Sequence, residues 1–283
     1  EAGIRLSSAN SINWGRLVPQ VVYYVSAYLD MVKQGSVEFG EEINVVVPTG
    51  NFGNILAAYF AKRMGVPIGK LICASNRNNV LTDFFKTGTY DMNRPFYTTL
   101  SPSMDILESS NFERFIYYIS GEDYELTAKR MADLKATGRM SVTPEELALV
   151  QRDFSGAFVN DDETEAVIEQ VYNSYGYLMD PHTAVAMGAY MKELQAHPED
   201  GARHTIIAST AHPFKFPPAI CKALDIAEGG TPYESLEHIS AVTGVAFPGP
   251  LAALQQKPLR FTKVIDKENM RHEIFDFIDS FGK

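Results

Sequence analysis

The feature that most constrains the fold of this chain is a strand, turn, helix and strand pattern. Residues 43–47 (Ile-Asn-Val-Val-Val) are rich in β-branched side chains and stop at Pro48-Thr49-Gly50. Residues 55–64 then read as a helix, and residues 71–74 supply a second short apolar strand. Two strands that a crossover helix joins pair in parallel. The sequence therefore predicts an α/β fold with a parallel sheet.

Further elements are expected on both sides of this unit. Apolar residues at three- and four-residue spacing after Asn13 predict a helix in which Pro19 fits only the first turn, and residues 204–208 predict a third buried strand. A cap followed by proline marks helix starts at Thr143-Pro144 and Asp180-Pro181. We also expect helices at residues 161–175, 217–224 and 267–281.

The middle of the chain has a different pattern from its two ends. Residues 78–200 are mainly helices and loops, and they read as an insertion into the sheet-forming part. We therefore predict one domain portion from residues 1–77 and 201–283, and a mainly helical insertion with connecting helices from residues 78–200.

Composition excludes several classes of function. The chain has 283 residues, 45% of them hydrophobic, which is enough for a substantial core. No apolar run approaches the roughly 18 residues that span a bilayer, and the net charge of −10 includes no basic stripe for nucleic acid. Cys73 and Cys221 lie in apolar stretches without metal-ligand spacing, so we expect reduced thiols, no metal site and a cytoplasmic protein. The chain starts at Glu1 without methionine, and we expect the parent protein to extend upstream.

The most specific local motif is Gly50-Asn51-Phe52-Gly53-Asn54, which follows the first predicted strand and opens a helix. Its glycines allow a tight turn and a close approach to a ligand, and the N–H groups at a helix start favour a phosphate dianion. The motif lacks the P-loop lysine and the Gly-x-Gly-x-x-Gly spacing, which argues against a nucleoside triphosphate or a dinucleotide. An ordinary glycine-containing turn is the alternative.

Three more segments can be read together with this motif. They are residues 8–16 (Ser-Ala-Asn-Ser-Ile-Asn-Trp-Gly-Arg), 180–186 (Asp-Pro-His-Thr-Ala-Val-Ala) and 209–216 (Ser-Thr-Ala-His-Pro-Phe-Lys-Phe). With residues 48–54 they resemble, in the same order, segments of threonine synthases of the longer type found in bacteria and fungi. The resemblance implies the parallel-sheet fold type II of pyridoxal-phosphate (PLP) proteins, which is similar to the tryptophan synthase β subunit.

The resemblance also implies roles for particular residues. Thr210 matches a hydroxyl that hydrogen-bonds the pyridine nitrogen of PLP, and the alternative is a threonine that caps the end of a strand. The residues that match the cofactor-phosphate loop are Gly50, Asn51, Phe52, Gly53 and Asn54. The residues that match the substrate-phosphate site are Asn10, Ser11 and Arg16, a set of donors suited to a dianion, although Asn13 makes a simple helix cap the alternative.

Three other side chains have two interpretations each. His182 and His212 carry imidazoles that titrate near neutral pH, which suits acid-base chemistry. Lys215 lies close to Thr210 in sequence and would attract an anionic ligand. The sequence favours a structural role for the histidines, with Asp180 as a helix cap, and a solvated loop position for Lys215.

The lysine that forms a Schiff base with PLP in the resembled family is not evident. The family carries it in a Phe-Lys-Asp-type segment further upstream, and neither that segment nor the glycine-rich substrate-carboxylate loop occurs in these residues. We therefore predict no catalytic residue in this chain and no activity of the chain alone.

For the parent protein, the resemblance implies PLP-dependent conversion of O-phospho-L-homoserine and water to L-threonine and phosphate. It would act as a monomer or homodimer, without a nucleic-acid or membrane partner. Two alternatives stay open, namely another PLP-dependent elimination or replacement, such as that of a serine or threonine dehydratase, and a non-catalytic phosphate-binding module.

Overall fold

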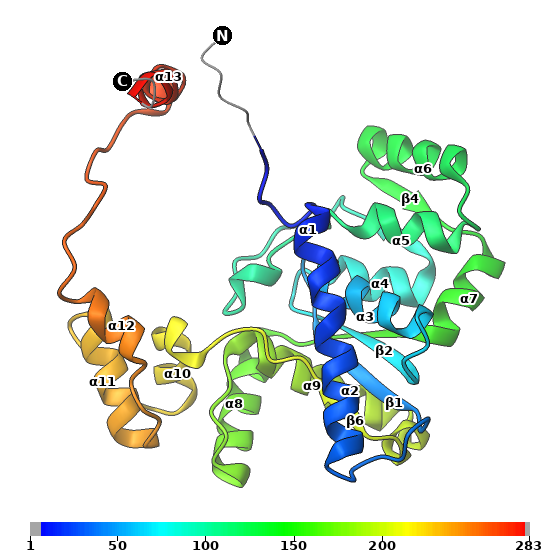
Figure 1. Ribbon diagram of the computed structural model, residues 1–283, viewed down its shortest axis with the longest axis horizontal. Helices are drawn as coiled ribbons and strands as arrows, with labels where there is room; N and C mark the ends of the chain where they lie inside the picture. The colour runs from blue at the N-terminus through cyan, green and yellow to red at the C-terminus, as the bar shows by residue number, and fades with distance from the viewer. Residues whose placement is uncertain (1–6, 281–283) are drawn as a thin grey trace. The chain divides into compact units, whose positions relative to one another are not determined.

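A computed structural model describes residues 7–280 of the chain. Two compact units are present, a larger one of residues 10–247 and a smaller one to which residues 248–280 belong. The larger unit holds a four-stranded sheet with the order β5-β2-β1-β6, in which every neighbouring pair is parallel (Figure 1). Its strands are β1 (Ile43–Pro48), β2 (Ile68–Ser75), β5 (Phe154–Phe158) and β6 (Thr205–Ile207).

The predicted parallel strand, helix and strand unit is confirmed. It consists of β1, α3 (Gly53–Arg63) and β2, with Val46 of β1 paired with Ile72 of β2. The predicted third strand is β6, which pairs with the other edge of β1. As a result, the loops that follow β1 and β6 leave the sheet side by side.

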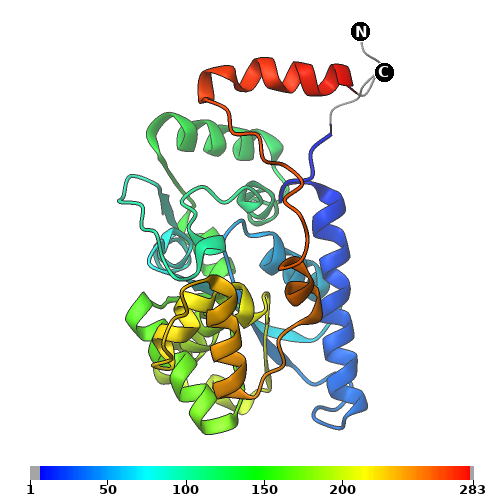
Figure 2. The ribbon, with the colours of Figure 1, turned by 90° about the vertical axis from the view of Figure 1, so that its left-hand side faces the viewer.

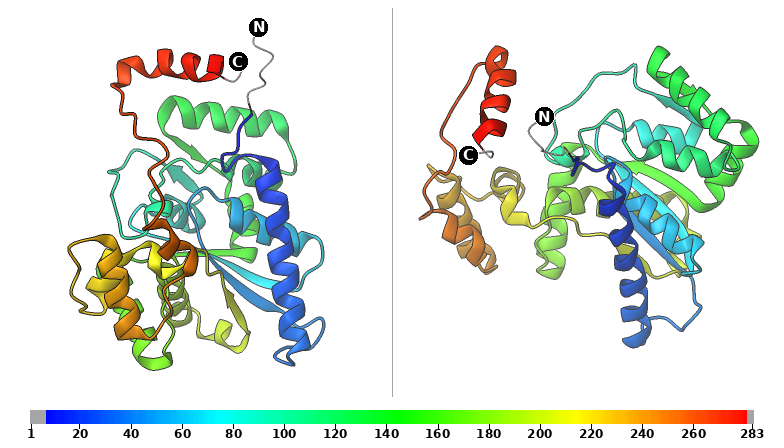
Figure 3. Two further views of the ribbon diagram at one scale, coloured as in Figure 1. Left: turned by 60° about the vertical axis from the view of Figure 1, so that its left-hand side comes forward. Right: turned by 45° about the horizontal axis from the view of Figure 1, so that its top comes forward.

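Side chains of β1 alternate between two hydrophobic clusters. Val45 and Val47 pack with the cluster that includes α3 and α4 (Val80–Thr87), whereas Val46 packs with the cluster that includes α9 (Pro181–Ala196). The sheet is therefore a middle layer with helices on both faces, as the turned views also show (Figures 2 and 3). Burial on both faces explains why the strands are apolar along their whole length.

The single helix expected after Asn13 is divided in two. Its parts are α1 (Trp14–Leu17) and α2 (Val21–Lys33), and the 3-10 turn η1 (Val18–Gln20) between them contains Pro19. Proline lacks the N–H that a continuous helix would use at this point, so a short turn is favoured before α2 begins.

The predicted helix starts at Thr143 and Asp180 are confirmed, and Asn160 caps the helix expected from residue 161. Thr143 and Asn160 form capping boxes with Glu146 and Glu163, and Asp180 accepts from the N–H of His182. The other helices of the larger unit are α5 (Phe112–Ile119), α6 (Tyr124–Thr137), α7 (Pro144–Asp153), α8 (Asp161–Tyr175), α10 (Pro217–Ala223) and α11 (Pro232–Thr243), with the 3-10 turns η2 (Pro102–Met104), η3 (Pro198–Ala202) and η4 (Pro213–Lys215).

The smaller unit contains helices only among its described residues. These are α12 (Gly249–Leu254), the 3-10 turn η5 (Lys267–Asn269) and α13 (Met270–Ser280), the last two matching the helix expected at residues 267–281. Within residues 7–280, no helix combines the length and the apolar character needed to cross a membrane.

The segment 78–200 is mainly helical, but it also contributes to the main sheet. Its strand β5 is the edge next to β2, and its helix α9 packs on β1, β2 and β5. It also holds a separate antiparallel pair, β3 (Thr89–Asp91) with β4 (Arg139–Ser141). The division into domains at residues 78 and 200 stays a prediction.

Both cysteines are unpaired and buried. Burial raises the pKa of the Cys73 thiol to about 12, although hydrogen bonds with Thr49 and Ser75 act in the opposite direction. A thiol with so high a pKa stays protonated and unreactive, as expected for a core residue.

Candidate functional site

A cavity of about 290 Å³ lies where the chain leaves the carboxyl ends of β1 and β6. In parallel α/β sheets this edge is where ligands bind. The cavity brings together residues from five separate parts of the sequence, namely Ser11, Arg16, Gln20, residues 48–54, Ser103, Met104, His182 and Thr210. All the residues predicted to bind cofactor or substrate line it except Asn10, whose carbonyl accepts a hydrogen bond from the N–H of Asn13 at 3.1 Å.

The loop of residues 50–54 is held in a conformation that most residues avoid. Phe52 precedes α3 with a φ of 64°, in the left-handed region, yet its side chain is only 1% exposed. The ring packs edge-on to Phe112, with centroids 5.4 Å apart, and against Phe115 at 5.2 Å. This aromatic anchor offsets the backbone strain and fixes where the loop turns.

Gly50 is required by a close approach of another segment. A Cβ atom at this position would lie 2.5 Å from the carbonyl oxygen of Ser103. The hydroxyl of Ser109 also donates to the Gly50 carbonyl at 2.6 Å. The absence of a side chain therefore lets residues 101–109 close over the loop.

Residues 50–54, which line the cavity, carry several hydrogen-bond donors. The first N–H groups of α3 have no intrahelical acceptor. The side-chain oxygen of Asn51 accepts from the N–H of Ser110 at 3.4 Å and from its hydroxyl at 3.1 Å. The side-chain oxygen of Asn54 accepts from the hydroxyl of Tyr24, whose pKa burial raises well above its ordinary value. Because both amide oxygens are bound to the protein, both NH₂ groups remain to donate to an anion.

Residues 109–111 join the loop to the segment that precedes α1. The hydroxyls of Ser110 and Ser11 lie 3.0 Å apart, and the side chain of Asn111 donates to the carbonyls of Ser11 and Asn51 at 2.9 and 3.0 Å. The two predicted phosphate sites therefore share one set of hydrogen bonds.

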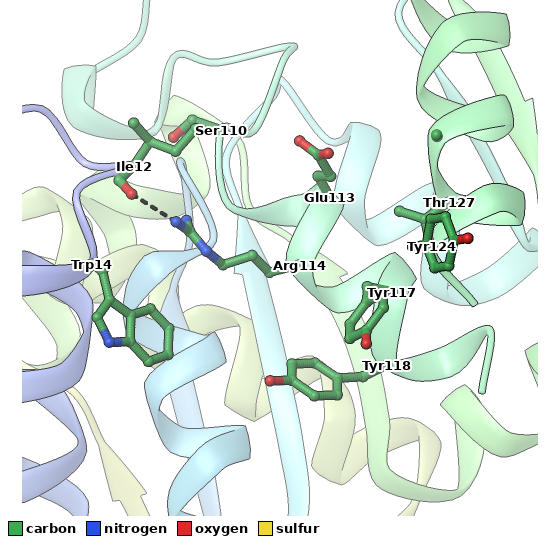
Figure 4. Close-up of a pocket in the computed structure, with 10 residues that line it drawn as sticks. Ile12, Trp14, Ser110, Glu113, Arg114, Tyr117, Tyr118, Tyr124 and Thr127 are labelled. Carbon is green, nitrogen blue, oxygen red and sulfur yellow. Dashed lines mark hydrogen bonds between the residues drawn. The ribbon is translucent and has the colours of Figure 1, made fainter. Parts of the chain in front are cut away.

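A neighbouring cavity of about 410 Å³ shows how the segment before α1 is fixed (Figure 4). The guanidinium of Arg114 reaches across it and donates to the carbonyl of Ile12 at 2.9 Å, the bond drawn as a dashed line. The same guanidinium lies 5.8 Å from the ring centroid of Trp14. Ser110 lines this cavity and bonds to Asn51, so the two cavities adjoin through one side chain.

His182 is a buried residue in the first turn of α9 and lines the cavity. Its Nδ1 lies 2.8 Å from Oδ1 of Asp180, and its Nε2 accepts from the N–H of Ser103 at 3.2 Å. An acceptor at Nε2 requires the proton to sit on Nδ1, so the ring donates to Asp180. This arrangement supports the structural role favoured by the sequence, because the ring holds Ser103 against Gly50.

The carboxyl of Asp180 is well partnered. Burial acts to raise its pKa, but hydrogen bonds from His182 and Thr183 outweigh burial and hold the pKa below its ordinary value. The ionised carboxylate therefore caps α9 and orients the His182 ring at the same time.

In the segment after β6, Thr210 lines the cavity, but the other two residues singled out in the sequence do not. Thr210 is exposed, lines the cavity, and makes no hydrogen bond through its hydroxyl in the described structure. His212 accepts from the N–H of Phe214 at 3.2 Å and caps η4, and Lys215 is exposed in that turn. Neither His212 nor Lys215 lines the cavity.

The charge of the cavity suits an anion. Among the described lining residues, Arg16 is the single charged side chain, and none is a lysine. The positive end of the α3 dipole adds to the same potential. The arrangement can hold phosphate groups, but the lining supplies no amine nucleophile.

Several functional neighbours were not anticipated from the sequence. Ser103, Met104 and residues 109–111 come from the stretch that was interpreted as part of an insertion. The abundance of Ser, Asn and Pro there was the available signal, but such composition indicates loops without saying which loop they contact.

Comparisons with known proteins give the family. Residues 183–274 match the family model described as threonine synthase, C-terminal. Human threonine synthase-like 1 is 50% identical over 229 residues, which cover 81% of this chain and 30% of the human protein. Threonine synthase of Schizosaccharomyces pombe is 40% identical over 77% of this chain and 46% of its own length. PLP-bound threonine synthase from Brucella melitensis matches the fold with a TM-score of 0.83 at 34% identity, over 98% of this chain and 53% of that chain.

The parallel sheet with helices on both faces, and the cavity at its carboxyl edge, define the class as fold type II of PLP proteins. Within that class the chain belongs to the threonine synthase family and corresponds to its C-terminal portion. It spans between 30% and 46% of the length of the curated relatives that it matches.

Proposed function

We propose that this chain supplies the phosphate-binding part of a PLP-dependent threonine synthase, which converts O-phospho-L-homoserine and water to L-threonine and phosphate. One observation carries the proposal. Residues from before α1, after β1 and after β6 line a single cavity that contains one cationic side chain and the start of α3.

The residues present fit the phosphate of PLP. The loop of residues 50–54 offers the first N–H groups of α3 and the NH₂ groups of Asn51 and Asn54, whose oxygens the protein already binds. A Cβ at Gly50 would clash with the carbonyl oxygen of Ser103, which lines the same cavity. When bound, PLP supplies a ring that stabilises negative charge at the reacting carbon of an amino acid.

Thr210 would hold the pyridine nitrogen of the ring. It follows β6, the strand beside β1, and its hydroxyl has no other partner in the described residues. A neutral hydroxyl donates to the ring nitrogen without requiring it to carry a proton, as a carboxylate would.

The substrate phosphate would be bound by Asn10, Ser11 and Arg16. Ser11 is fixed by Ser110 and Asn111, and Arg16 lines the same cavity in α1. A guanidinium with nearby hydroxyl and amide donors stabilises the dianion that leaves the substrate. Asn10 lies outside the lining, so its part in this set is the least supported by the geometry.

The lysine that bonds to PLP would come from the portion of the parent protein outside this chain, and the chain alone would be inactive. The lining of the cavity contains no lysine among the described residues, which supports this division of roles. A cytoplasmic location is part of the proposal, and the two unpaired cysteines are consistent with it.

Binding and turnover test separate parts of the proposal. We expect this chain to bind PLP at least about tenfold more tightly than pyridoxal, which lacks the phosphate, because charge-assisted hydrogen bonds are lost. Equilibrium dialysis measures both affinities, and equal affinities would overturn the phosphate assignment. Asn54→Ala should weaken PLP but not pyridoxal, while Asn93→Ala, outside the cavity lining, should change neither.

Turnover requires the full parent protein. We expect it to release phosphate from O-phospho-L-homoserine and to form L-threonine. Arg16→Gln should raise the KM for this substrate without weakening PLP. A parent protein that holds PLP yet eliminates water from serine or threonine, and leaves phosphohomoserine intact, would replace this proposal with a dehydratase.

A further inference from the structure

A fully buried amide lies between the two predicted phosphate sites. Asn111 immediately precedes α5 and is 0% exposed. Asparagine at the start of a helix commonly accepts a hydrogen bond from an N–H group of the first turn. The side chain of Asn111 makes no such bond. Its amide is used for contacts outside the backbone of α5, so a capping role does not explain this residue.

The NH₂ group of Asn111 binds two carbonyls from distant parts of the chain. Its Nδ2 donates to the carbonyl of Ser11 at 2.9 Å and to the carbonyl of Asn51 at 3.0 Å. Its side-chain oxygen accepts from the guanidinium of Arg114. An amide side chain offers two donor hydrogens and one acceptor oxygen, and all three are in use here. A buried polar group with its bonds complete specifies one arrangement of its partners.

At one end, Asn111 orients the loop of residues 50–54. The carbonyl of Asn51 accepts from Nδ2 of Asn111 and also from its N–H at 3.1 Å. In a trans peptide group the C=O and the N–H point in opposite directions, and no cis peptide occurs among the described residues. The two donors on the Asn51 carbonyl therefore also fix the direction of the Phe52 N–H, at the start of α3.

At the other end, Asn111 holds the segment that precedes α1. Its bond to the Ser11 carbonyl is followed by the bond from Arg114 to the carbonyl of Ile12 at 2.9 Å (Figure 4). The same guanidinium binds the amide oxygen of Asn111. The start of α5 therefore supplies donors to two successive carbonyls of the segment that carries Ser11 and leads into Arg16.

We propose that Asn111 is a positioning residue for both phosphate sites, because one nitrogen fixes the cofactor-phosphate loop and the substrate-phosphate segment relative to each other. Asn111 does not line the cavity, so it acts through Asn51 and Ser11 and not by contact with a ligand. This inference rests on the proposed function. It adds that the affinities for the two phosphate groups depend on the same side chain, whereas Asn54 belongs to the cofactor-phosphate loop alone.

Asn111→Asp tests the NH₂ group with almost no change in shape. A carboxylate still accepts from Arg114, but it cannot donate to the two carbonyls, and their oxygens repel it. We expect the variant to bind PLP roughly tenfold or more weakly than the wild type does, with the affinity for pyridoxal changed less than about threefold. Inorganic phosphate, titrated into the full chain saturated with PLP, should also bind about tenfold more weakly. Calorimetric titration measures the three affinities.

A second variant and two controls separate positioning from stability. Asn111→Ser is neutral, suits the start of a helix, and should lose affinity for both phosphates as Asn111→Asp does. Asn93 also donates through Nδ2 to two acceptors, Asp91 and the carbonyl of Thr137, but it is exposed and outside the cavity lining. Asn93→Asp should lower the Tm and leave the affinities within about twofold of the wild type. Asn54→Ala should weaken PLP and leave inorganic phosphate unchanged.

The outcomes distinguish this inference from the function on which it rests. Loss of affinity for only one of the two phosphates in the Asn111 variants, or for neither, would overturn the shared role of Asn111 and leave the proposed function standing. Equal binding of PLP and pyridoxal by the wild type would overturn the proposed function, and this inference with it. If Asn111→Asp does not fold, Asn111→Ser gives the decisive comparison.

Discussion

At the scale of single residues, Gly50 combines two requirements that no other residue meets at once. It must let the chain turn after β1, and it must leave room for the carbonyl of Ser103, which would lie 2.5 Å from a Cβ atom. Gly53 is less constrained, since a Cβ there would lie 3.3 Å from the side chain of Asn111, which can move slightly. The two glycines of this motif therefore differ in how much room a side chain would have at each position.

This difference gives a direct test of the cradle. Gly50→Ala should destabilise the protein by about 1–3 kcal/mol, as overpacking against backbone does, and should weaken PLP about tenfold or more because residues 101–109 are displaced. Gly53→Ala should have the smaller effect on both quantities. Urea unfolding and PLP titration of the two variants measure this, and equal effects would show that the contact with Ser103 does not matter.

Asp180 makes stability depend on pH in a defined direction. The pKa of its carboxyl is lowered in the folded protein from an ordinary value of 3.8, so the ionised form stabilises the fold. That contribution is fully present above the ordinary pKa and is lost as the pH falls through the lower folded-state pKa.

We therefore expect the free energy of unfolding to fall as the pH drops below the ordinary carboxyl value of 3.8, and to fall less steeply in Asp180→Asn, which lacks the ionising group. Near neutral pH the variant should be less stable, by roughly 1–3 kcal/mol, because an amide replaces the charged acceptor of His182 and Thr183. Denaturant unfolding at a series of pH values measures both effects. An identical pH dependence in the two proteins would exclude Asp180 as the source.

At the scale of helices and strands, the helices whose starts were predicted from the sequence have capping residues at those starts. The helix α7 begins with Thr143, Pro144 and Glu146, which form a capping box in the structure, and Asp180 with Pro181 opens α9. Such signals lie within one turn of helix, so they are legible without tertiary structure.

The capping box of α7 gives a prediction for a single element. Thr143→Ala should destabilise the protein by about 1 kcal/mol, because the N–H of Glu146 loses its acceptor. Thr143→Ser keeps the hydroxyl and should stay close to the wild type. Thermal unfolding of the pair measures the difference, and a serine variant as unstable as the alanine variant would point to packing of the methyl group instead.

The strand β5 shows why other elements were missed. Its sequence, Phe-Ser-Gly-Ala-Phe, has no β-branched residue and contains a glycine. Gly156 lies under α4, where a Cβ would come 3.2 Å from the Cα of Thr82, so close helix packing selects this residue. Strand formation here depends on β2 and α4, and local propensity does not reveal such partners.

The cavity, like the secondary structure, could be predicted only in part. Residues 50–54 and 210 were indicated by their positions after strands and by resemblance, and the structure places them together. The closing contacts of Ser103 and of residues 109–111 are made across more than fifty positions of sequence, as in the bond from Ser109 to Gly50. No local pattern encodes a partner at that separation.

At the scale of the whole molecule, the division into two units suggests that the larger one is independent. The main sheet, both of its hydrophobic clusters and the cavity at its carboxyl edge lie within residues 10–247. Residues 248–280 contain three short helical elements, and none of their side chains is buried in those elements.

A chain that ends at Phe247 should therefore keep its fold. We expect its Tm to stay within about 4 °C of that of the full chain, which corresponds to roughly 1 kcal/mol at this size, and its affinity for PLP to be unchanged. Differential scanning calorimetry and PLP titration measure the two properties. Aggregation, or loss of the cooperative transition, would show that the smaller unit is needed for stability.

The pairing of β1 with β6 has a consequence for how the protein is made. Asn44 pairs with Thr205, so β1 cannot gain this neighbour on the ribosome until most of the chain has been synthesised. Contacts between such distant positions form slowly, and the apolar strand edges stay exposed until they form. The early strands β1 and β2 can pair first, but Thr210 reaches the loop of residues 50–54 only after β6 has docked. Nascent chains that stop before β6 should therefore be the species that chaperones retain, and the phosphate cavity should be among the last parts of the sheet to mature.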